Sequence, residues 1–254
     1  MNDAPLLTKH QLGQFRRDGY LLVRGLYGAV EVQQIAAWTE ALAKAPEEPG
    51  KAMMYFETSR ADGSRILSRI ENFVPFHPGY AALINRKRMH QAVSELFGEP
   101  GILFKDKINF KLPGGDGFKA HQDVQAGWDD YASLHITAMV AIDETTPENG
   151  SLEFLPGAHR RGLLGEKWAP LTDADTGNQP YVALHCQPGD AVFFDSFAPH
   201  RSEPNRTSRA RRVLYITYNR ASEGDHRAQY YADKRRNYPP DIEREAGREY
   251  RFKV

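Results

Sequence analysis

Hydrophobic side chains recur at helical spacing in two segments of the first hundred residues. The first stripe consists of Val32, Ile35, Ala36, Thr39 and Leu42, and the second consists of Met89, Val93 and Leu96. A repeat of three to four residues places such side chains on one face of a helix. The pattern therefore predicts helices over residues 31–45 and 86–97, ended by Pro46 and Gly98, after a short strand over residues 20–23.

After Gly101 the pattern changes to short runs of β-forming residues between turns that contain glycine and proline. We expect strands over residues 102–112, 133–143, 151–155, 181–186, 191–194 and 211–219. Many short strands at fairly even spacing are typical of a β-sandwich or a barrel. The fold is therefore expected to be mainly β, with helices wrapped around a β-core.

The same patterns divide the chain into three stretches. Residues 1–100 are expected to form a mainly helical wrapping, residues 101–220 the β-core, and residues 221–254 a C-terminal arm of loops with a terminal helix. No repeat, low-complexity segment or convincing linker separates these stretches. We therefore expect one domain over residues 1–254, a length that a single domain can have.

The composition argues against several classes of protein. The 254 residues carry 33 basic and 33 acidic side chains, so no general attraction to nucleic acid or to an anionic membrane is expected. The single cysteine, Cys186, excludes a disulfide framework and a multi-cysteine zinc site. Neither a signal peptide nor an apolar run of about 18 residues is visible, which favours a cytoplasmic protein without a membrane partner.

A pattern of two histidines and one carboxylate is the main candidate for chemistry. His121 and Asp123 follow the glycine-rich loop of residues 113–117, and His200 follows an apolar strand and Pro199. Two imidazoles and one carboxylate can occupy one face of a divalent metal, which is the ligand set of non-haem Fe(II) oxygenases. Because the chain has nine histidines, one His-x-Asp match carries little weight alone, and the competing interpretation is a pair of surface loop residues.

The last expected strand carries a candidate anion-binding arginine. Alternation places Arg211, Val213, Tyr215 and Thr217 on one face of that strand. An arginine beside an aromatic ring at the mouth of a barrel is suited to bind a carboxylate through two parallel hydrogen bonds, and Ser202 could share that carboxylate. The competing interpretation is a surface arginine at the start of a strand.

Taken together, these motifs resemble the phytanoyl-CoA dioxygenase family of Fe(II)- and 2-oxoglutarate-dependent oxygenases. The matching segments, in chain order, are His121-Gln122-Asp123, Ala141-Ile142-Asp143, residues 148–152, residues 156–159 and residues 200–211. Several ordered matches are more specific than any single one. The resemblance implies a double-stranded β-helix, the jelly-roll, cupin-like core with which the strand pattern agrees.

The resemblance also implies a cofactor and a reaction. Fe(II) would be bound by His121, Asp123 and His200, with 2-oxoglutarate and dioxygen as co-substrates. The co-substrate contacts that the family implies are Arg211, Ser202, Lys107, Asn109 and Met139, the last at a position where many members have tryptophan. Oxidative decarboxylation would release succinate and carbon dioxide and drive hydroxylation of an unactivated C–H bond. An aspartate at position 123 favours hydroxylation over halogenation, because related halogenases have a small residue there.

Substrate contacts are expected in the N-terminal part and just after the metal motif. The candidates are Arg69, Glu57, Asn72, Gln125 and Trp128. Aromatic, acidic and amide groups suit a small polar or cationic substrate. Segments 68–72 and 121–128 resemble family members that hydroxylate 2-aminoethylphosphonate and its N-methylated relatives. An aminophosphonate is therefore the expected substrate of a monomeric or homodimeric enzyme.

Three alternatives stay open at this point. One is a natural-product tailoring hydroxylase of the same family, which would act on an aminoglycoside or a similar scaffold. Another is a non-enzymatic jelly-roll protein that binds a small ligand and carries the metal-like residues by chance. The third is a cupin-type metalloenzyme, which is disfavoured because the chain contains no His-x-His pair.

Overall fold

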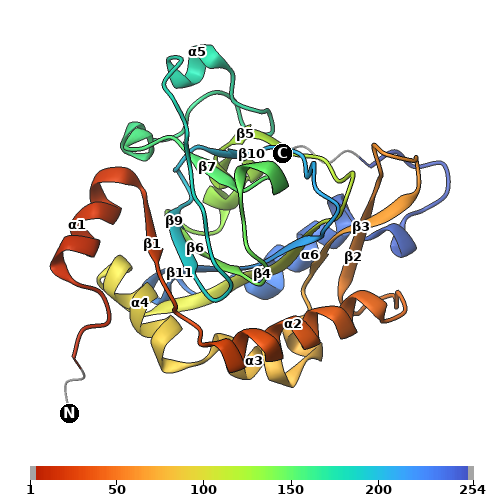
Figure 1. Ribbon diagram of the computed structural model, residues 1–254, viewed down its shortest axis with the longest axis horizontal. Helices are drawn as coiled ribbons and strands as arrows, with labels where there is room; N and C mark the ends of the chain where they lie inside the picture. Colours follow the sequence, from red (N-terminus) through yellow and green to blue (C-terminus); the bar gives the residue numbers. More distant parts are fainter. Residues whose placement is uncertain (1–3, 251–254) are drawn as a thin grey trace.

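Two antiparallel β-sheets form the centre of the computed structural model, which describes residues 4–250 (Figure 1). The strands are β1 (Tyr20–Val23), β2 (Met53–Thr58), β3 (Arg65–Glu71), β4 (Gly101–Lys111), β5 (Phe118–His121), β6 (His135–Ala141), β7 (Leu152–Phe154), β8 (Val182–Ala183), β9 (Ala191–Asp195), β10 (His200–Ser202) and β11 (Arg211–Arg220). The larger sheet has the strand order β1-β9-β6-β11-β4-β3-β2, and the smaller sheet has the order β5-β10-β7-β8. Two such sheets are what a jelly-roll core requires.

Strand β11 shows why the larger sheet has two different faces. Its side chains alternate, as the sequence predicted. Val213 and Tyr215 pack between the two sheets, against β7 and β9. Leu214 and Ile216, both fully buried, point to the opposite face, where the helices pack. The face between the sheets is therefore the one on which Arg211 also lies.

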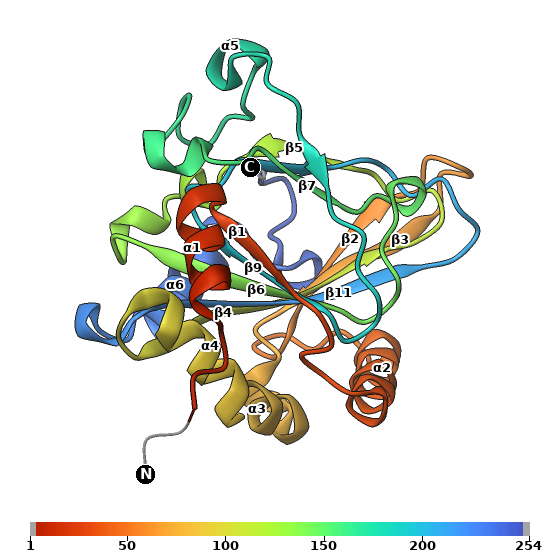
Figure 2. The ribbon, with the colours of Figure 1, turned by 60° about the vertical axis from the view of Figure 1, so that its left-hand side comes forward.

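The helices lie outside the two sheets. They are α1 (Lys9–Asp18), α2 (Ala29–Lys44), α3 (Pro78–Ile84), α4 (Lys87–Phe97), α5 (Asp173–Thr176) and α6 (Arg227–Asn237). Figure 2 shows α2, α3 and α4 on one side of the larger sheet and strands β5 and β7 on the other. The expected helices over residues 31–45 and 86–97 correspond to α2 and α4, and Gly98 ends α4 in a left-handed conformation with φ of 79°.

A hairpin in the N-terminal part is the main difference from the expected fold. Strands β2 and β3 pair with each other, and β3 pairs with β4, so the hairpin extends the larger sheet within residues expected to be mainly helical. The hydrophobic pattern does not reveal β3, because its buried positions include Arg69 and Glu71 beside Ile70. Apolar alternation identifies a strand only where the buried face is apolar.

Two further segments refine the predicted elements. The strand expected over residues 181–186 is reduced to β8, although Cys186 still forms an isolated bridge with Thr145. In the C-terminal stretch, α6 packs against β4 through Tyr231, whose hydroxyl hydrogen-bonds to backbone and side-chain atoms of Asp106. Within residues 4–250, no helix has both the length and the apolar character that crossing a bilayer requires.

Candidate metal centre and adjoining cavity

Two strands of the smaller sheet bring the predicted metal ligands together. His121 at the end of β5 and His200 at the start of β10 are direct partners in the antiparallel register. Asp123 begins a 3₁₀ helix, Asp123–Ala126, and one residue, Gln122, separates it from β5. Potential ligand atoms of the three residues all lie within 4.8 Å of one another, and each histidine Nε2 is 3.9 Å from Oδ1 of Asp123. The structure therefore places the three side chains around one point.

Backbone carbonyls fix the orientation of both imidazoles. Nδ1 of His121 is 2.7 Å from the carbonyl oxygen of Lys119, and Nδ1 of His200 is 3.0 Å from that of Ala198. A carbonyl only accepts hydrogen bonds, so each Nδ1 carries the proton and each Nε2 presents a lone pair towards Asp123. These two orienting contacts were not predicted from the sequence.

The protonation states also suit a divalent metal. Burial, reinforced by the neighbouring His200, lowers the pKa of His121 to about 4. Burial also lowers the pKa of His200. For Asp123 burial alone would raise the pKa, but the two imidazoles lower it below its ordinary value. Neutral imidazoles and an ionised carboxylate are the forms that bind metal, so this donor set fits Fe(II).

Gln122, between the two ligands in sequence, holds the local backbone in place. Its buried side chain donates hydrogen bonds to the carbonyl oxygens of Gly162 and Phe197 and accepts one from the amide of Leu164. The Gln122 side chain points away from the position that the three potential ligands surround, so His121 and Asp123 can both point towards that position. The turn is thereby tied to two other segments of the chain.

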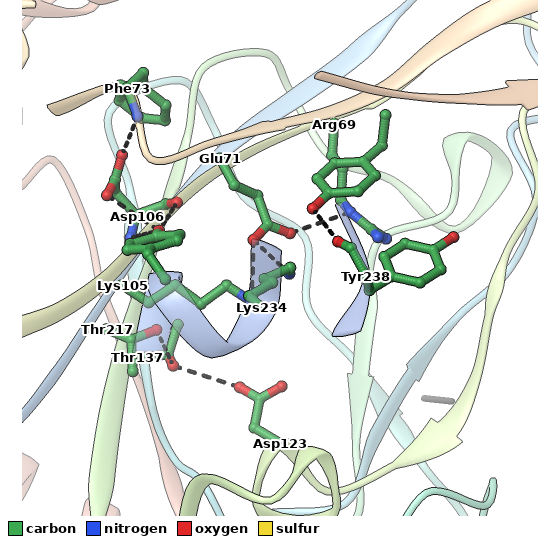
Figure 3. Close-up of polar contacts among 12 residues, drawn as sticks. Arg69, Glu71, Phe73, Lys105, Asp106, Asp123, Thr137, Thr217, Lys234 and Tyr238 are labelled. Atoms are coloured by element: carbon green, nitrogen blue, oxygen red, sulfur yellow. Dashed lines mark hydrogen bonds and ion pairs between the residues drawn. The ribbon is translucent and has the colours of Figure 1, made fainter. Parts of the chain in front are cut away.

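A pair of threonines supports the carboxylate from the larger sheet. The hydroxyl of Thr137 on β6 lies 3.4 Å from Oδ2 of Asp123 and 2.9 Å from the hydroxyl of Thr217 on β11 (Figure 3). This contact leaves Oδ1 as the atom that faces the imidazoles. The sequence placed Thr217 on the inward face but did not identify Thr137.

Two connected cavities open from the metal ligands. The smaller lies between the sheets and is lined by the three ligands and by apolar side chains that include Leu152 and Phe194. The larger has a volume of about 660 Å³ and is bounded on one side by α6. His121, Asp123 and Trp128 line both cavities, so the metal point is accessible from each.

The smaller cavity receives two of the predicted co-substrate residues. Lys107 and Asn109 on β4 both line it. Asn109 is 5% exposed, and its Oδ1 has no hydrogen-bond partner within the described part of the chain. Burial, together with the nearby Lys105, lowers the pKa of Lys107 to about 8. An unpartnered buried oxygen and a buried amine are what a polar ligand would satisfy.

Arg211 lies deeper between the sheets, on the same face of β11. It is 2% exposed, donates to the carbonyl oxygen of Gly150, and its Nε has no hydrogen-bond partner among residues 4–250. Ser202 does not stand free beside it, because the Ser202 hydroxyl lies 2.8 Å from Nζ of Lys111. Lys111, also buried, is a neighbour of Arg211 that the sequence interpretation missed.

Met139 occupies the core between the sheets. It is 1% exposed and packs in the cluster that contains Val213 and Tyr215. It lies opposite Tyr215 in the register of β6 and β11. Its position is thus close to the inward face that carries the co-substrate candidates, although it does not line either cavity.

The five predicted substrate residues divide into two groups. Arg69 and Trp128 line the larger cavity, as a substrate contact would. Glu57, Asn72 and Gln125 do not line it. Asn72 instead accepts a hydrogen bond from Arg227, and its positive φ of 55° serves the turn after β3. Asn72 therefore lies in a turn outside the lining of the larger cavity.

Gln125 and Glu57 also have positions that differ from the expected one. Gln125 is fully buried, accepts from the amide of Gln122, and donates to the carbonyl oxygens of Glu166 and Ala169. Both N–H groups of its amide are thus used within the protein. Glu57 is half-buried beside the glycine-rich loop, where burial raises its pKa. Both residues were chosen by residue type, which does not reveal tertiary partners.

Comparisons with known proteins agree with this geometry. The family model "Phytanoyl-CoA dioxygenase (PhyH)" matches residues 15–213. The chain is 41% identical over 244 residues to a 2-aminoethylphosphonate dioxygenase of the uncultured bacterium HF130_AEPn_1, covering 96% of this chain and 93% of the relative. It is 42% identical over 235 residues to a methylphosphonate hydroxylase of Gimesia maris, covering 91% and 88%.

A solved structure supports the fold. EctD from S. alaskensis, crystallised with 2-oxoglutarate and 5-hydroxyectoine, superposes with a TM-score of 0.75 at 25% identity. The match covers 88% of this chain and 79% of that one. Together with the two antiparallel sheets, this similarity confirms the predicted jelly-roll core.

Proposed function

This chain belongs to the phytanoyl-CoA dioxygenase family, and we propose that it hydroxylates a small phosphonate, with 2-aminoethylphosphonate as the first candidate. It is an oxidoreductase of the iron- and 2-oxoglutarate-dependent class. The observation that carries the proposal is the cluster of His121, Asp123 and His200, which opens onto a cavity large enough for a small metabolite. The non-enzymatic alternative is not consistent with membership of this family.

In the proposed centre, His121, Asp123 and His200 would hold Fe(II). When bound with 2-oxoglutarate and dioxygen, the metal supplies the oxidising chemistry for C–H hydroxylation, with release of succinate and carbon dioxide. The chain holds the donor groups in place, since backbone carbonyls orient both imidazoles and Thr137 supports the carboxylate.

The co-substrate would bind between the sheets. Arg211 and Lys111 would take its distal carboxylate, because both are buried cations on the same face. Lys107 and Asn109 would contact its polar groups nearer the metal, where they line the smaller cavity. Ser202 would act through Lys111, to which its hydroxyl is hydrogen-bonded. Met139 would support this pocket by packing rather than by a polar contact.

The substrate class rests on the two most similar relatives described above. One is named for 2-aminoethylphosphonate and the other for methylphosphonate, so their substrates share the phosphonate and differ in the amine. Arg69 and Trp128 line the larger cavity and would contact such a substrate. An aromatic ring such as Trp128 also suits the ammonium group of an aminophosphonate.

A substrate panel tests the proposal. The full chain, supplied with Fe(II), 2-oxoglutarate and dioxygen, is incubated with 2-aminoethylphosphonate, its N-trimethyl relative, methylphosphonate or an aminoglycoside. We expect succinate to form in step with one hydroxylated phosphonate. Stoichiometric succinate with the aminoglycoside and none with the phosphonates would instead support the natural-product alternative. Absence of coupled succinate with every phosphonate would overturn the proposal.

We further propose a cytoplasmic location, where ferrous iron and 2-oxoglutarate are available, and a monomeric or homodimeric state. The balance of 33 basic and 33 acidic residues supports a small molecule rather than nucleic acid as the partner. Cell fractionation and light scattering coupled to gel filtration test these two points.

A further inference from the structure

A buried carboxylate beside the metal centre is surrounded by three cations (Figure 3). Glu71 on β3 is 1% exposed. Its Oε1 lies 3.1 Å from Nε of Arg69, and its Oε2 lies 2.6 Å from Nζ of Lys234 and 3.6 Å from Nζ of Lys105. These partners come from β3, β4 and α6, which are far apart in sequence.

The basic side chains of this cluster outnumber its one carboxylate. Arg69, Lys105 and Lys234 surround Glu71. Burial alone would raise the pKa of Glu71, but Lys105 and Lys234 hold it well below its ordinary value, so the carboxylate is ionised. An anion bound beside these three basic side chains would meet hydrogen-bond donors that Glu71 already holds in place.

These basic side chains face the larger cavity. Arg69, Glu71, Lys105 and Lys234 all line it, together with His121 and Asp123 of the metal centre. Two carboxylates on the opposite part of the lining, Asp130 and Asp233, have cationic partners of their own outside the cluster, Lys167 and Arg236. They therefore do not neutralise the cations around Glu71.

We propose that Arg69, Lys105 and Lys234, held in place by Glu71, bind the phosphonate group of the substrate, and that Lys234 sets the preference for a doubly charged head group. This inference rests on the proposed function. The three oxygens of a phosphonate can each meet one of the three basic side chains, and its second negative charge would favour the protonated form of Lys234. A carboxylate or a sulfonate supplies only one negative charge.

The position of Lys234 supports a role in specificity. It lies on α6, outside residues 15–213 that the family model matches. Lys105 contacts two aromatic rings, because its Nζ lies 5.3 Å from the ring centroid of Trp128 and 5.5 Å from that of Tyr230. The C-terminal helix thus completes a cationic subsite whose other members come from the sheet.

Burial lowers the pKa of Lys234 well below its ordinary value, and the adjacent Lys105 and Arg69 add to the effect. A bound dianion beside the amine would oppose both effects. The lowered pKa means that the protonated form of Lys234 is disfavoured in the free protein. A bound phosphonate would reduce this effect.

The test compares two ligands of the same shape and different charge. Lys234→Met is made in the full chain, and binding of 2-aminoethylphosphonate and of 2-aminoethanesulfonate is measured by calorimetry without oxygen, with Fe(II) and 2-oxoglutarate present. We expect phosphonate binding to weaken about 30-fold or more, because a buried charge-assisted contact is lost, and sulfonate binding to change little. The phosphonate kcat/KM should fall in parallel.

Lys44→Met is the control. Lys44 lies on α2, its side chain is 74% exposed, and it does not line the larger cavity. This variant also removes one positive charge from the chain, but it should keep the preference of the original chain. Lys234→Arg, which retains the charge, should restore most of the preference.

Several outcomes would overturn the inference. One is an equal loss of phosphonate and sulfonate binding in Lys234→Met, which would make the cluster purely structural. If that variant does not fold, the affinities of the unaltered protein for methylphosphonate and methanesulfonate are compared instead. Equal affinities would contradict a site for a doubly charged head group. If the chain hydroxylates a phosphonate and Lys234→Met does not change this activity, the proposed subsite is wrong and the proposed function stands. If phosphonate binding depends on Lys234 but no phosphonate is hydroxylated, the proposed function is wrong and the subsite stands.

Discussion

Arg211 and Lys111 are direct cross-strand neighbours on β11 and β4, so two buried cations lie side by side between the sheets. Both donate to the carbonyl oxygen of Gly150. Among residues 4–250, neither forms an ion pair with a carboxylate. Burial and the charge of Arg211 disfavour protonation of Lys111. The pair is accounted for if the distal carboxylate of 2-oxoglutarate binds beside it.

Lys111→Met should test whether Lys111 binds the distal carboxylate of 2-oxoglutarate. The variant is expected to raise the KM for 2-oxoglutarate and to weaken its binding by about 2 kcal/mol or more, because one partner of the bound carboxylate is lost. Without co-substrate, its melting temperature should fall modestly, because the Ser202 hydroxyl and the Glu203 carbonyl oxygen lose a hydrogen-bond donor. Calorimetric titration and thermal unfolding check the two effects. Lys44→Met, at a side chain 74% exposed on α2, is the control. Unchanged co-substrate affinity in Lys111→Met would exclude this role.

The binding of 2-oxoglutarate should be coupled to proton uptake. Burial, together with the charge of Arg211, lowers the pKa of Lys111 to about 6, so the amine is mostly neutral above that pH. A bound carboxylate favours the charged amine and raises its pKa. Affinity should therefore strengthen as pH falls from about 8 towards 6, with proton uptake. Titrations in buffers of different ionisation enthalpy measure that uptake, and the same uptake in Lys111→Met would contradict the assignment.

The neighbouring arginines of β11 offer a matched comparison. Arg211→Met should chiefly raise the KM for 2-oxoglutarate, with a loss of about 2–5 kcal/mol in co-substrate binding. Arg212 points to the opposite face of β11, where it pairs with Asp143. Arg212→Met should leave that KM unchanged even if it lowers stability. Steady-state kinetics in 2-oxoglutarate distinguish the two variants. Equal effects would mean that Arg211 acts only through the fold.

The sequence predicted those parts of the site whose signal is local. His121 and Asp123 form a short motif, and the alternation in residues 211–217 gives the inward face of β11 without tertiary information. The helices α2 and α4 also follow from local spacing and from their terminal proline and glycine. In each case the informative residues are close in sequence.

Lys105 and Lys111 were not predictable in this way. They alternate with Lys107 along β4 and have the spacing of an ordinary solvated strand face, of which the family resemblance implied only Lys107. Lys105 and Lys111 become buried only because the smaller sheet and α6 cover that face, which is a tertiary property. Lys234 is one of several basic residues in a charged helix, and only the fold brings it to Glu71.

Gln125 was expected to contact the substrate, but its amide forms hydrogen bonds within the protein. Its substitution tests which of these two roles it has. Gln125→Leu removes the side-chain partners of one amide and two carbonyls, so it should lower the free energy of unfolding by about 3 kcal/mol. The fraction that remains folded should keep its KM for substrate. Chemical denaturation and kinetics at low temperature measure these quantities, with Gln33→Leu on exposed α2 as the control. A raised KM without loss of stability would restore Gln125 as a substrate contact.

Asp123→Ala tests the carboxylate of the metal centre. Asp123 provides the only carboxylate among the three clustered ligands, and its Oδ1 faces both imidazoles at 3.9 Å. Its loss should weaken iron binding roughly 100-fold or more and abolish hydroxylation, because two neutral nitrogens alone hold Fe(II) poorly. Iron content after equilibrium dialysis and hydroxylated product are the two measurements. Asp116→Ala, in the exposed glycine-rich loop, should retain both. Full iron content and activity in Asp123→Ala would remove Asp123 from the ligand set, and with it the physical basis of the proposed centre.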